Sequence, residues 1–286
     1  MPFWFRYFLD GSAFLLAAGM LTAAPLIPVA GRRGWAMLAR IVLVIPAAIV
    51  VALSGTPLPL WFYAIWCAVL LAWVYVHCRS HDVKPAVAIA ARGAAVLLAL
   101  AALAWEASWQ IAPRLAVQPG QKIYVIGDSI SAGLELTHRG TWPDLLGRRM
   151  GVNMVNLSQA GAKVSAGLLQ ARSVDEPNAM VILEIGGNDL MNTDADDFRA
   201  DYEKLILLLR APQRSLVMME LPTLPLGNFY SMTLRDLARR YSIPLIPRRV
   251  LVDVWATPGA TIDSVHLTPA GQQQLADRLA EILGPR

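Results

Sequence analysis

Residues 123–130 read Ile-Tyr-Val-Ile-Gly-Asp-Ser-Ile, and this stretch decides the fold of the second half of the chain. Four consecutive apolar residues that end at a glycine are typical of a strand buried on both faces of a parallel sheet. In such sheets ligands bind beyond the carboxyl ends of the strands. The Gly-Asp-Ser turn therefore places Ser129 where a binding or catalytic group would lie.

The chain on either side of this stretch alternates between predicted strands and helices. The strands are expected at 122–127, 152–156, 179–185, 214–220 and 243–246. The helices are expected near 141–150, 163–172, 195–210, 229–241 and 268–283. This alternation predicts one α/β domain over 122–286, built on a doubly wound parallel sheet.

Three further motifs follow in order: Asn-Leu-Ser-Gln-Ala-Gly at 156–161, Gly-Gly-Asn-Asp at 186–189 and Asp-Ser-Val-His at 263–266. With the Gly-Asp-Ser turn, they make residues 121–284 resemble the SGNH (GDSL-type) hydrolase family. That family is named for four residues, which here are Ser129, Gly161, Asn188 and His266; Ile130 stands where the family usually has leucine. The resemblance implies a flavodoxin-like, three-layer α/β/α domain, and it looks closest to the thioesterase I/lysophospholipase branch.

These motifs contain the groups of a serine esterase. A serine hydroxyl is a weak nucleophile until a base takes its proton, and His266 follows a carboxylate, Asp263, by three residues. We therefore expect Ser129, Asp263 and His266 to be catalytic, with Asp263 orienting the imidazole. By resemblance, the oxyanion would be bound by the backbone N–H groups of Ser129 and Gly161 and by the side-chain amide of Asn188.

Each motif also has an ordinary structural interpretation. Gly-Asp-Ser and Gly-Gly-Asn-Asp are common turns, and Thr268 with Pro269 could simply begin a helix. Asp128 and Asp189 are expected to brace loops. No metal or cofactor is expected, because the histidines at 77, 81, 138 and 266 show no ligand spacing.

The first 112 residues have a different composition. They carry seven Lys or Arg and three acidic residues, whereas residues 113–286 carry eighteen of each, so the formal charge of +4 belongs to the N-terminal part. A neutral catalytic half argues against nucleic acid as a partner. Long uncharged stretches instead predict an all-α membrane domain over 1–112 and a linker at 113–121. About four transmembrane helices are expected, near 12–30, 36–53, 58–77 and 88–110.

Basic residues give these spans an orientation. Arg32, Arg33 and Arg40 flank the first connection and Arg79, Lys84 and Arg92 the third, whereas the second has no charge. The positive-inside rule then puts both chain ends outside a bacterial cytoplasmic (inner) membrane, with the catalytic domain on the periplasmic or extracellular side. A cleaved signal peptide is the alternative for the first span. It fits less well, because Arg6 is offset by Asp10 and Pro25 would follow the cut.

The substrate remains open from sequence. The apolar segment after the fourth strand, with Leu221, Leu224, Leu226, Phe229 and Tyr230, could bind an acyl chain, or it could pack against helices or the bilayer. The first hypothesis is a membrane-anchored esterase that hydrolyses membrane-associated acyl esters. One alternative is an O-acyltransferase or deacetylase that acts on an envelope polysaccharide together with a membrane-protein partner. A non-catalytic membrane scaffold is the other.

Overall fold

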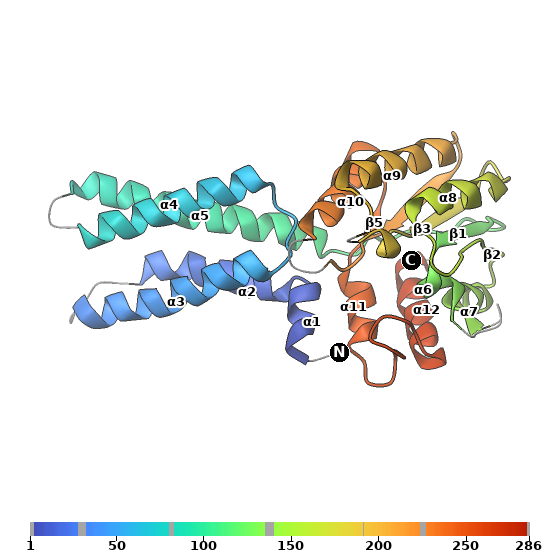
Figure 1. Cartoon of the computed structure of the whole chain (residues 1–286), viewed down its shortest axis with the longest axis horizontal. Helices are drawn as coiled ribbons and strands as arrows, with labels where there is room; N and C mark the ends of the chain where they lie inside the picture. Colours follow the sequence, from blue (N-terminus) through green and yellow to red (C-terminus); the bar gives the residue numbers. More distant parts are fainter. Residues whose placement is uncertain are drawn as a thin grey trace. The chain divides into compact units, whose positions relative to one another are not determined.

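In a computed structural model the chain forms two compact units, one of residues 1–10 and 111–286 and the other of residues 11–110 (Figure 1). The structure describes residues 3–27, 33–79, 83–134, 140–190, 192–223 and 227–284. Of these, residues 3, 4 and 33–37 are described for the backbone alone. The predicted site residues Leu224 and Leu226 and the orienting residue Arg32 lie outside the described residues, as do His81 and His138.

The larger unit is built on a five-stranded sheet in the order β2-β1-β3-β4-β5, with every neighbouring pair parallel. The strands are β1 (Ile123–Gly127), β2 (Met154–Asn156), β3 (Met180–Glu184), β4 (Ser215–Met219) and β5 (Leu245–Ile246). Each falls inside a predicted strand. The predicted α/β fold with a parallel sheet is confirmed.

Helices cover both faces of this sheet and make three layers (Figure 1). One layer contains α7 (Trp142–Met150), α11 (Arg249–Trp255) and α12 (Pro269–Leu283); the other contains α8 (Val164–Gln170), α9 (Ala195–Leu209) and α10 (Asn228–Arg240). The sequence did not predict α11. Five of its seven residues are apolar and three of these are β-branched valines, so the helix depends on burial against α12 more than on helix propensity.

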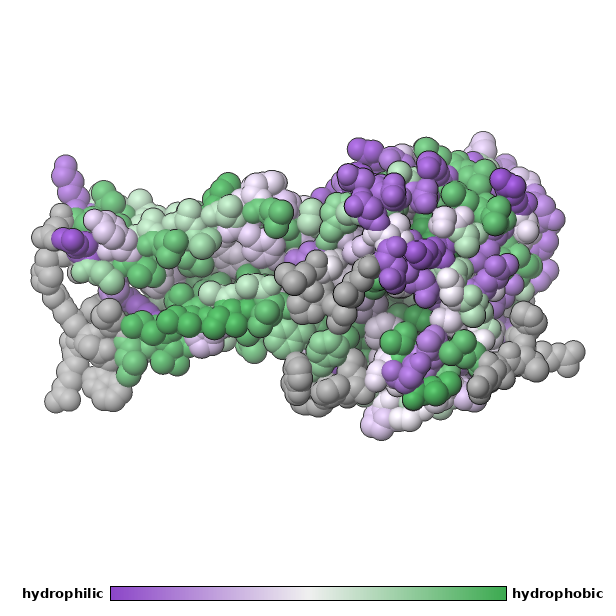
Figure 2. Space-filling model, in the orientation of Figure 1, coloured by the Kyte–Doolittle hydropathy of each residue, from purple (hydrophilic) through white to green (hydrophobic). Residues whose placement is uncertain are grey.

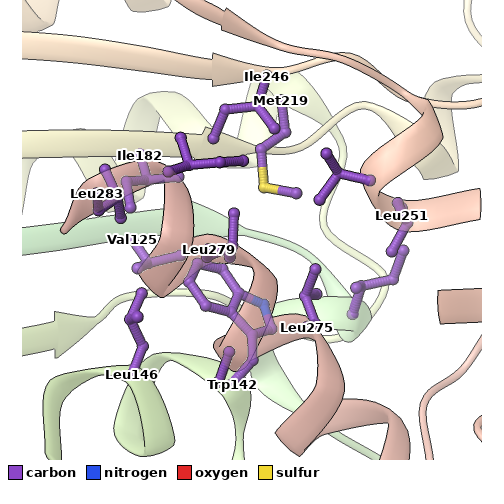
Figure 3. Packing of buried hydrophobic residues seen from close by; sticks show 14 of the residues in the cluster. Val125, Trp142, Leu146, Ile182, Met219, Ile246, Leu251, Leu275, Leu279 and Leu283 are labelled. Carbon is purple, nitrogen blue, oxygen red and sulfur yellow. The ribbon is translucent and has the colours of Figure 1, made fainter. Parts of the chain in front are cut away.

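Alternate residues along each strand supply the two faces of the core. Val125, Ile182 and Met219 join the cluster in which α12 presents Leu275 and Leu279, as Figure 3 shows. On the opposite face, a side chain at Gly167 in α8 would meet Ile126 and Ile185, so the helix approaches the sheet closely there. Burial on both faces explains why the strands are continuous apolar runs.

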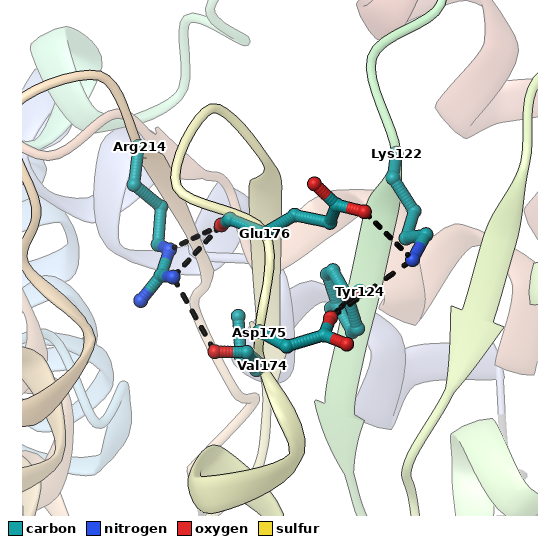
Figure 4. Close-up of polar contacts among 6 residues, drawn as sticks. All are labelled: Lys122, Tyr124, Val174, Asp175, Glu176 and Arg214. Atoms are coloured by element: carbon teal, nitrogen blue, oxygen red, sulfur yellow. Dashed lines mark hydrogen bonds and ion pairs between the residues drawn. The ribbon is translucent and has the colours of Figure 1, made fainter.

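A polar cluster closes the amino-terminal ends of the strands, opposite the Gly-Asp-Ser turn (Figure 4). Lys122 Nζ donates to Glu176 Oε1 at 3.2 Å, and the Tyr124 hydroxyl donates to Asp175. Arg214 Nη2 donates to the Glu176 carbonyl at 2.8 Å. These contacts hold the loop before β3 against β1 and β4, which leaves the other end of the sheet for chemistry.

The second unit is helical. It contains α2 (Ser12–Ala23), the 3-10 turn η1 (Ala24–Leu26), α3 (Arg33–Leu53), α4 (Leu60–Cys78) and α5 (Pro85–Trp109). Small residues such as Ala17, Ala18, Ala99 and Ala102 are buried between these helices. Many large apolar side chains, such as Leu60 and Leu97, face outward, and apolar residues cover much of this unit's surface in Figure 2.

Within the described residues, α4 and α5 are long and apolar enough to cross a membrane, and Ser12–Leu26 and Leu38–Leu53 are shorter apolar helical segments. Two such helices suggest membrane association only weakly, so the four predicted spans remain a hypothesis.

Two segments group differently from the predicted domain plan. Helix α1 (Phe3–Leu9), which falls within the predicted membrane domain 1–112, groups with the α/β unit. The predicted linker 113–121 also packs in part on that unit, where the Leu115 N–H donates to the Ile282 carbonyl at 2.8 Å. Leu115 and Val117 contact the core beside α12.

Candidate active site

The Gly-Asp-Ser turn joins β1 to the short helix α6 (Ser129–Ala132). The Asp128 carboxylate caps this helix by accepting the Ile130 N–H at 3.0 Å. Gly127 has no room for a side chain, because a Cβ there would lie 2.7 Å from Ser158 Oγ and 2.8 Å from the Glu184 carbonyl oxygen. Close packing around Gly127 therefore fixes the backbone that presents Ser129.

Ser129, His266 and Asp263 form one hydrogen-bonded chain. His266 Nε2 lies 3.0 Å from Ser129 Oγ, and His266 Nδ1 lies 2.6 Å from Asp263 Oδ2. The hydrogen bond with the His266 ring lowers the pKa of Asp263 to about 2, so its carboxylate stays ionised. A serine, a base and a carboxylate that orients the base are the groups that nucleophilic acyl transfer requires.

The loop that carries His266 is held at both ends. Thr261 and Leu267 form an antiparallel bridge across it, and Ser264 has a positive φ of 77°. Asp263 Oδ1 also accepts the backbone N–H of His266 at 2.8 Å. Thr268 then caps α12 by accepting the Gly271 N–H at 3.2 Å, so the predicted helix start is confirmed. The same turn begins α12 and fixes the imidazole.

The three predicted oxyanion donors lie in the loops after β1, β2 and β3. Gly161 has a φ of 77°, a conformation that favours glycine, and is exposed. Asn188 Nδ2 donates to the Ala162 carbonyl at 3.0 Å and lies 3.4 Å from Asp128 Oδ2. The firm bond to Ala162 anchors the Asn188 amide beside the Gly161 loop, and the longer contact is the one that a substrate oxygen could replace.

Asp189 braces this region, as its expected role requires. Its Oδ2 accepts the Val164 N–H at 2.9 Å, and its Oδ1 accepts the Thr193 hydroxyl at 2.9 Å. The carboxylate thus ties the loop after β3 to the start of α8 and to the segment before α9.

A buried polar chain that the motifs did not predict lies behind the nucleophile. Trp142 Nε1 donates to Ser131 Oγ at 3.1 Å, and Ser131 Oγ donates to Glu184 Oε2 at 2.6 Å. Burial, and then the neighbouring Asp128 charge, raises the pKa of Glu184 well above its ordinary value. Burial also raises the pKa of Asp128 to about 6. In the sequence, Glu184 is only the last residue of an apolar strand. Its position beneath the candidate site results from tertiary packing, which no motif predicts.

Two glutamines complete this support. Gln170 accepts the Gly127 N–H at 3.0 Å and donates to the Gly127 carbonyl at 3.1 Å. Gln272 accepts the Trp142 N–H at 2.7 Å and donates to the Ile130 carbonyl at 3.2 Å. Both glutamines bond backbone groups far away in sequence, and no local pattern distinguishes them from surface glutamines.

Ser129 and His266 open into a cavity of about 470 Å³, a size typical of small-molecule sites. Apolar side chains make much of its lining: Phe5, Leu9, Ile130, Leu190, Leu221, Pro222, Trp255 and Val265. Asn188 and Asp263 lie at the same cavity. A few polar groups in an apolar pocket suit a substrate with one polar reacting bond and an apolar body.

The predicted acyl-binding residues are divided by this geometry. Leu221 lines the cavity, whereas Phe229 and Tyr230 lie on α10 and are not among its described lining residues. The Tyr230 hydroxyl donates to the Thr193 carbonyl at 2.7 Å, and its ring lies 5.0 Å from that of Phe198. Tyr230 therefore fits the packing alternative.

A serine, a histidine and a carboxylate within hydrogen-bonding distance at the carboxyl edge of a parallel sheet are typical of α/β serine hydrolases. The model of the GDSL-like Lipase/Acylhydrolase family matches residues 125–274, which are more than half of the chain. The chain belongs to this family, and it is a hydrolase of the esterase class.

Two relatives are similar over most of their own length. An arylesterase from Vibrio mimicus is 26% identical over 181 residues, covering 59% of this chain and 90% of the arylesterase. Thioesterase 1/protease 1/lysophospholipase L1 from Escherichia coli K12 is 26% identical over 176 residues, covering 57% of this chain and 83% of the relative. A crystal structure of TesA is 25% identical with a TM-score of 0.51, covering 56% of this chain and 96% of that structure.

Proposed function

We propose that this protein is a membrane-anchored serine esterase that hydrolyses acyl esters with an apolar acyl group, at the outer face of a bacterial cytoplasmic membrane. One observation carries the proposal. The hydrogen-bonded chain of Ser129, His266 and Asp263 opens into a cavity lined largely by apolar side chains.

In the proposed reaction, Ser129 Oγ attacks the ester carbonyl carbon while His266 Nε2 takes the hydroxyl proton. Asp263, ionised over the physiological range because the pKa is about 2, stabilises the imidazolium through Nδ1–H. The imidazolium then gives the proton to the leaving alkoxide, which leaves an acyl-enzyme on Ser129. Water attacks this ester with His266 as base, and the carboxylic acid departs as Ser129 regains its proton.

The tetrahedral oxyanion would lie among the backbone N–H groups of Ser129 and Gly161 and the Asn188 amide. Gly161 is exposed and has a left-handed backbone conformation, which suits a glycine whose backbone comes close to a substrate. The Asn188 amide is already held by Ala162. Donors fixed before the reaction stabilise the transition state without reorganisation, and this is usually the largest electrostatic contribution to acyl transfer.

Both sequence relatives support an ester substrate, because one is named an arylesterase and the other a thioesterase and lysophospholipase. The apolar cavity favours acyl groups longer than acetyl, since each buried methylene contributes roughly 0.8 kcal/mol. A lysophospholipid or a similar single-chain amphiphile has the required ester and apolar chain.

Membrane anchoring is supported by the outward-facing apolar side chains of the helical unit. Leu60 is 84% exposed and Leu97 is 67% exposed, an arrangement that suits lipid better than water. Residues 1–10 and 111–286 form one compact unit, so any membrane crossings by the intervening chain would be even in number. The proposed four crossings meet this condition, and the basic connections favour an outer location for the α/β unit.

The enzymatic proposal is tested by comparing wild type with Ser129→Ala on esters from acetyl to octanoyl. We expect wild type to prefer the longer acyl groups and Ser129→Ala to lose nearly all turnover on every ester. Folded Ser129→Ala with wild-type turnover would remove the serine mechanism. Strict preference for acetyl esters would favour the transferase or deacetylase alternative, and wild type with no turnover on any acyl ester would favour the scaffold.

The topology is tested with a membrane-impermeant maleimide in intact cells. Cys67 and Cys78 are both free and exposed, so each can serve as a reporter or be replaced. Gln118→Cys in a Cys67→Ala, Cys78→Ala background should be labelled. Native Cys78 in a Cys67→Ala background should be labelled only after the membrane is permeabilised. The reverse pattern would contradict the orientation.

A further inference from the structure

Helix α1 contributes to the active-site cavity although it lies outside the family-matched segment 125–274. Phe5 and Leu9 both line the cavity that holds Ser129 and His266. They are four residues apart and therefore share one face of the helix. Leu9 is buried, whereas Phe5 is half-buried. Helix α1 thus brings an apolar stripe, Phe5 and Leu9, to the cavity of Ser129 and His266, although it lies more than 100 residues before Ser129 in the sequence.

A set of ion pairs fixes α1 to the α/β unit. Arg6 Nη2 donates to Asp253 Oδ1 on α11 at 2.7 Å. Asp253 Oδ2 in turn lies 3.3 Å from Arg278 Nη1 on α12, and the Asp253 side chain is only 15% exposed. Arg6 Nε also lies 3.6 Å from Asp10 Oδ2 on the next helical turn. A shared, largely buried carboxylate orders both arginines more firmly than an isolated surface pair would.

The Arg6–Asp253 ion pair joins the two helices, α1 and α11, that also supply residues to the cavity. Asp253 lies on α11, the helix that also brings Trp255 to the cavity. On α1, Arg6 directly follows Phe5, so the bond from Arg6 to Asp253 sets how α1 presents Phe5. The position of the α1 stripe is therefore coupled to the α11 wall of the same cavity.

We propose that α1 is an acyl-chain subsite, in which Phe5 and Leu9 contact the hydrocarbon part of the ester and the Arg6–Asp253 pair holds them in place. This inference rests on the proposed esterase function. It assigns to the N-terminal helix a role in specificity and not in the bond-making steps. The substrate class is an ester with an acyl chain long enough to reach α1 from Ser129.

The expected change in kcat/KM follows from the free energy of transferring methylene groups from water into an apolar site. Each methylene that loses its contact with α1 should lower kcat/KM roughly fourfold. Phe5→Ala combined with Leu9→Ala should therefore reduce kcat/KM for octanoyl esters by about tenfold to a hundredfold, with little change for acetyl esters. Arg6→Leu should shift chain preference in the same direction by a smaller factor.

The experiment measures kcat/KM for p-nitrophenyl acetate, butyrate, hexanoate and octanoate with the full-length protein. Tyr7→Ala is the matched control, because Tyr7 is an exposed α1 residue and is not among the described residues that line the cavity. A second variant, Leu9→Trp, keeps an apolar residue but fills space, and should exclude octanoate while acetate turnover continues. Asp253→Asn should shift chain preference in the same direction as Arg6→Leu, because both substitutions remove the same ion pair.

An unchanged chain-length profile in both the double alanine variant and Leu9→Trp would overturn the subsite. Equal losses on acetate and octanoate in both variants would overturn it as well, because α1 would then support the fold and not the acyl chain. The proposed esterase function is tested separately. Wild type should hydrolyse the acetate ester, and Ser129→Ala should abolish this turnover. Failure of the subsite is thus distinguishable from failure of the proposed function.

Discussion

The two units use apolar residues in opposite ways. In the α/β unit, strand residues such as Val125 and Ile182 are completely buried, and the polar groups among them are bonded to one another. In the helical unit, small alanines are buried between the helices, whereas leucines such as Leu60 and Leu97 face outward. The first pattern is typical of an α/β enzyme core, and the second is the one expected of helices that pack in lipid.

The difference also explains where chemistry resides. The α/β unit holds two carboxyl groups in different environments around the candidate site. Glu184 is buried with a raised pKa, whereas Asp263 is exposed with a lowered pKa. Burial at Glu184 and the hydrogen bond with His266 at Asp263 thus shift the two pKa values in opposite directions.

The largest effect is expected from the base. His266→Ala should lower kcat by roughly 10⁶-fold, and Asp263→Asn by about 10⁴-fold, because the amide misorients the imidazole without removing it. Steady-state kinetics on purified, folded variants checks this order. A His266→Ala variant more active than Asp263→Asn would contradict the assigned roles.

Asn188→Ala should lower kcat by about 10²- to 10³-fold with little change in KM, because an oxyanion donor acts mainly in the transition state. Asn192→Ala is a control, since Asn192 is an exposed neighbour that donates to the Leu190 carbonyl at 3.3 Å. Loss in KM alone would place Asn188 in substrate binding.

A matched pair of leucines sharpens the comparison of solvents. Leu71 on α4 is 65% exposed and Leu207 on α9 is 52% exposed, although they belong to different units. Leu71→Arg should oppose membrane insertion by about 2.5 to 3.5 kcal/mol. Leu207→Arg should change stability by no more than about 0.5 kcal/mol. The effect of Leu71→Arg is measured as the fraction of membrane-integrated protein, and the effect of Leu207→Arg by thermal unfolding. Equally small effects of both substitutions would argue against lipid around α4.

The smallest effect concerns pH. Because the folded pKa of Asp128 is raised to about 6 from 3.8, its stabilising contribution is present at low pH and is lost as pH rises through about 6. Unfolding free energy should therefore fall between about pH 4 and pH 7 in wild type and fall less in Asp128→Asn. Asp175→Asn should keep the wild-type slope, since a hydrogen bond from Tyr124 lowers the pKa of Asp175 and moves its titration below this window. Identical slopes in wild type and Asp128→Asn would contradict the cause given for the shift.

The sequence correctly predicted those helices and strands that depend mainly on their own residues. The apolar runs of β1 and β3 and the Thr268–Pro269 start of α12 needed only burial and capping rules. The motif order predicted that Ser129, Asp263 and His266 would lie together, and they are within hydrogen-bonding distance.

Other features depended on partners that are distant in sequence. Gln170 and Glu184 matter because folding brings them to Gly127 and Ser131. Helix α1 is apolar like the segments that follow it, and its contact with the distant helix α11 groups it with the α/β unit. The side chain of Tyr230 could not be oriented from the sequence, because its place at the start of α10 does not show that its ring packs against Phe198.

The most direct test of the esterase site is covalent labelling of the full-length protein with a fluorophosphonate, followed by peptide mass spectrometry. The account predicts one adduct on Ser129, formed rapidly in wild type and at a greatly reduced rate in His266→Ala. Ester turnover should be lost over the same time course as the Ser129 adduct forms. Full ester turnover after labelling, or an adduct on another serine with Ser129 unmodified, would contradict it.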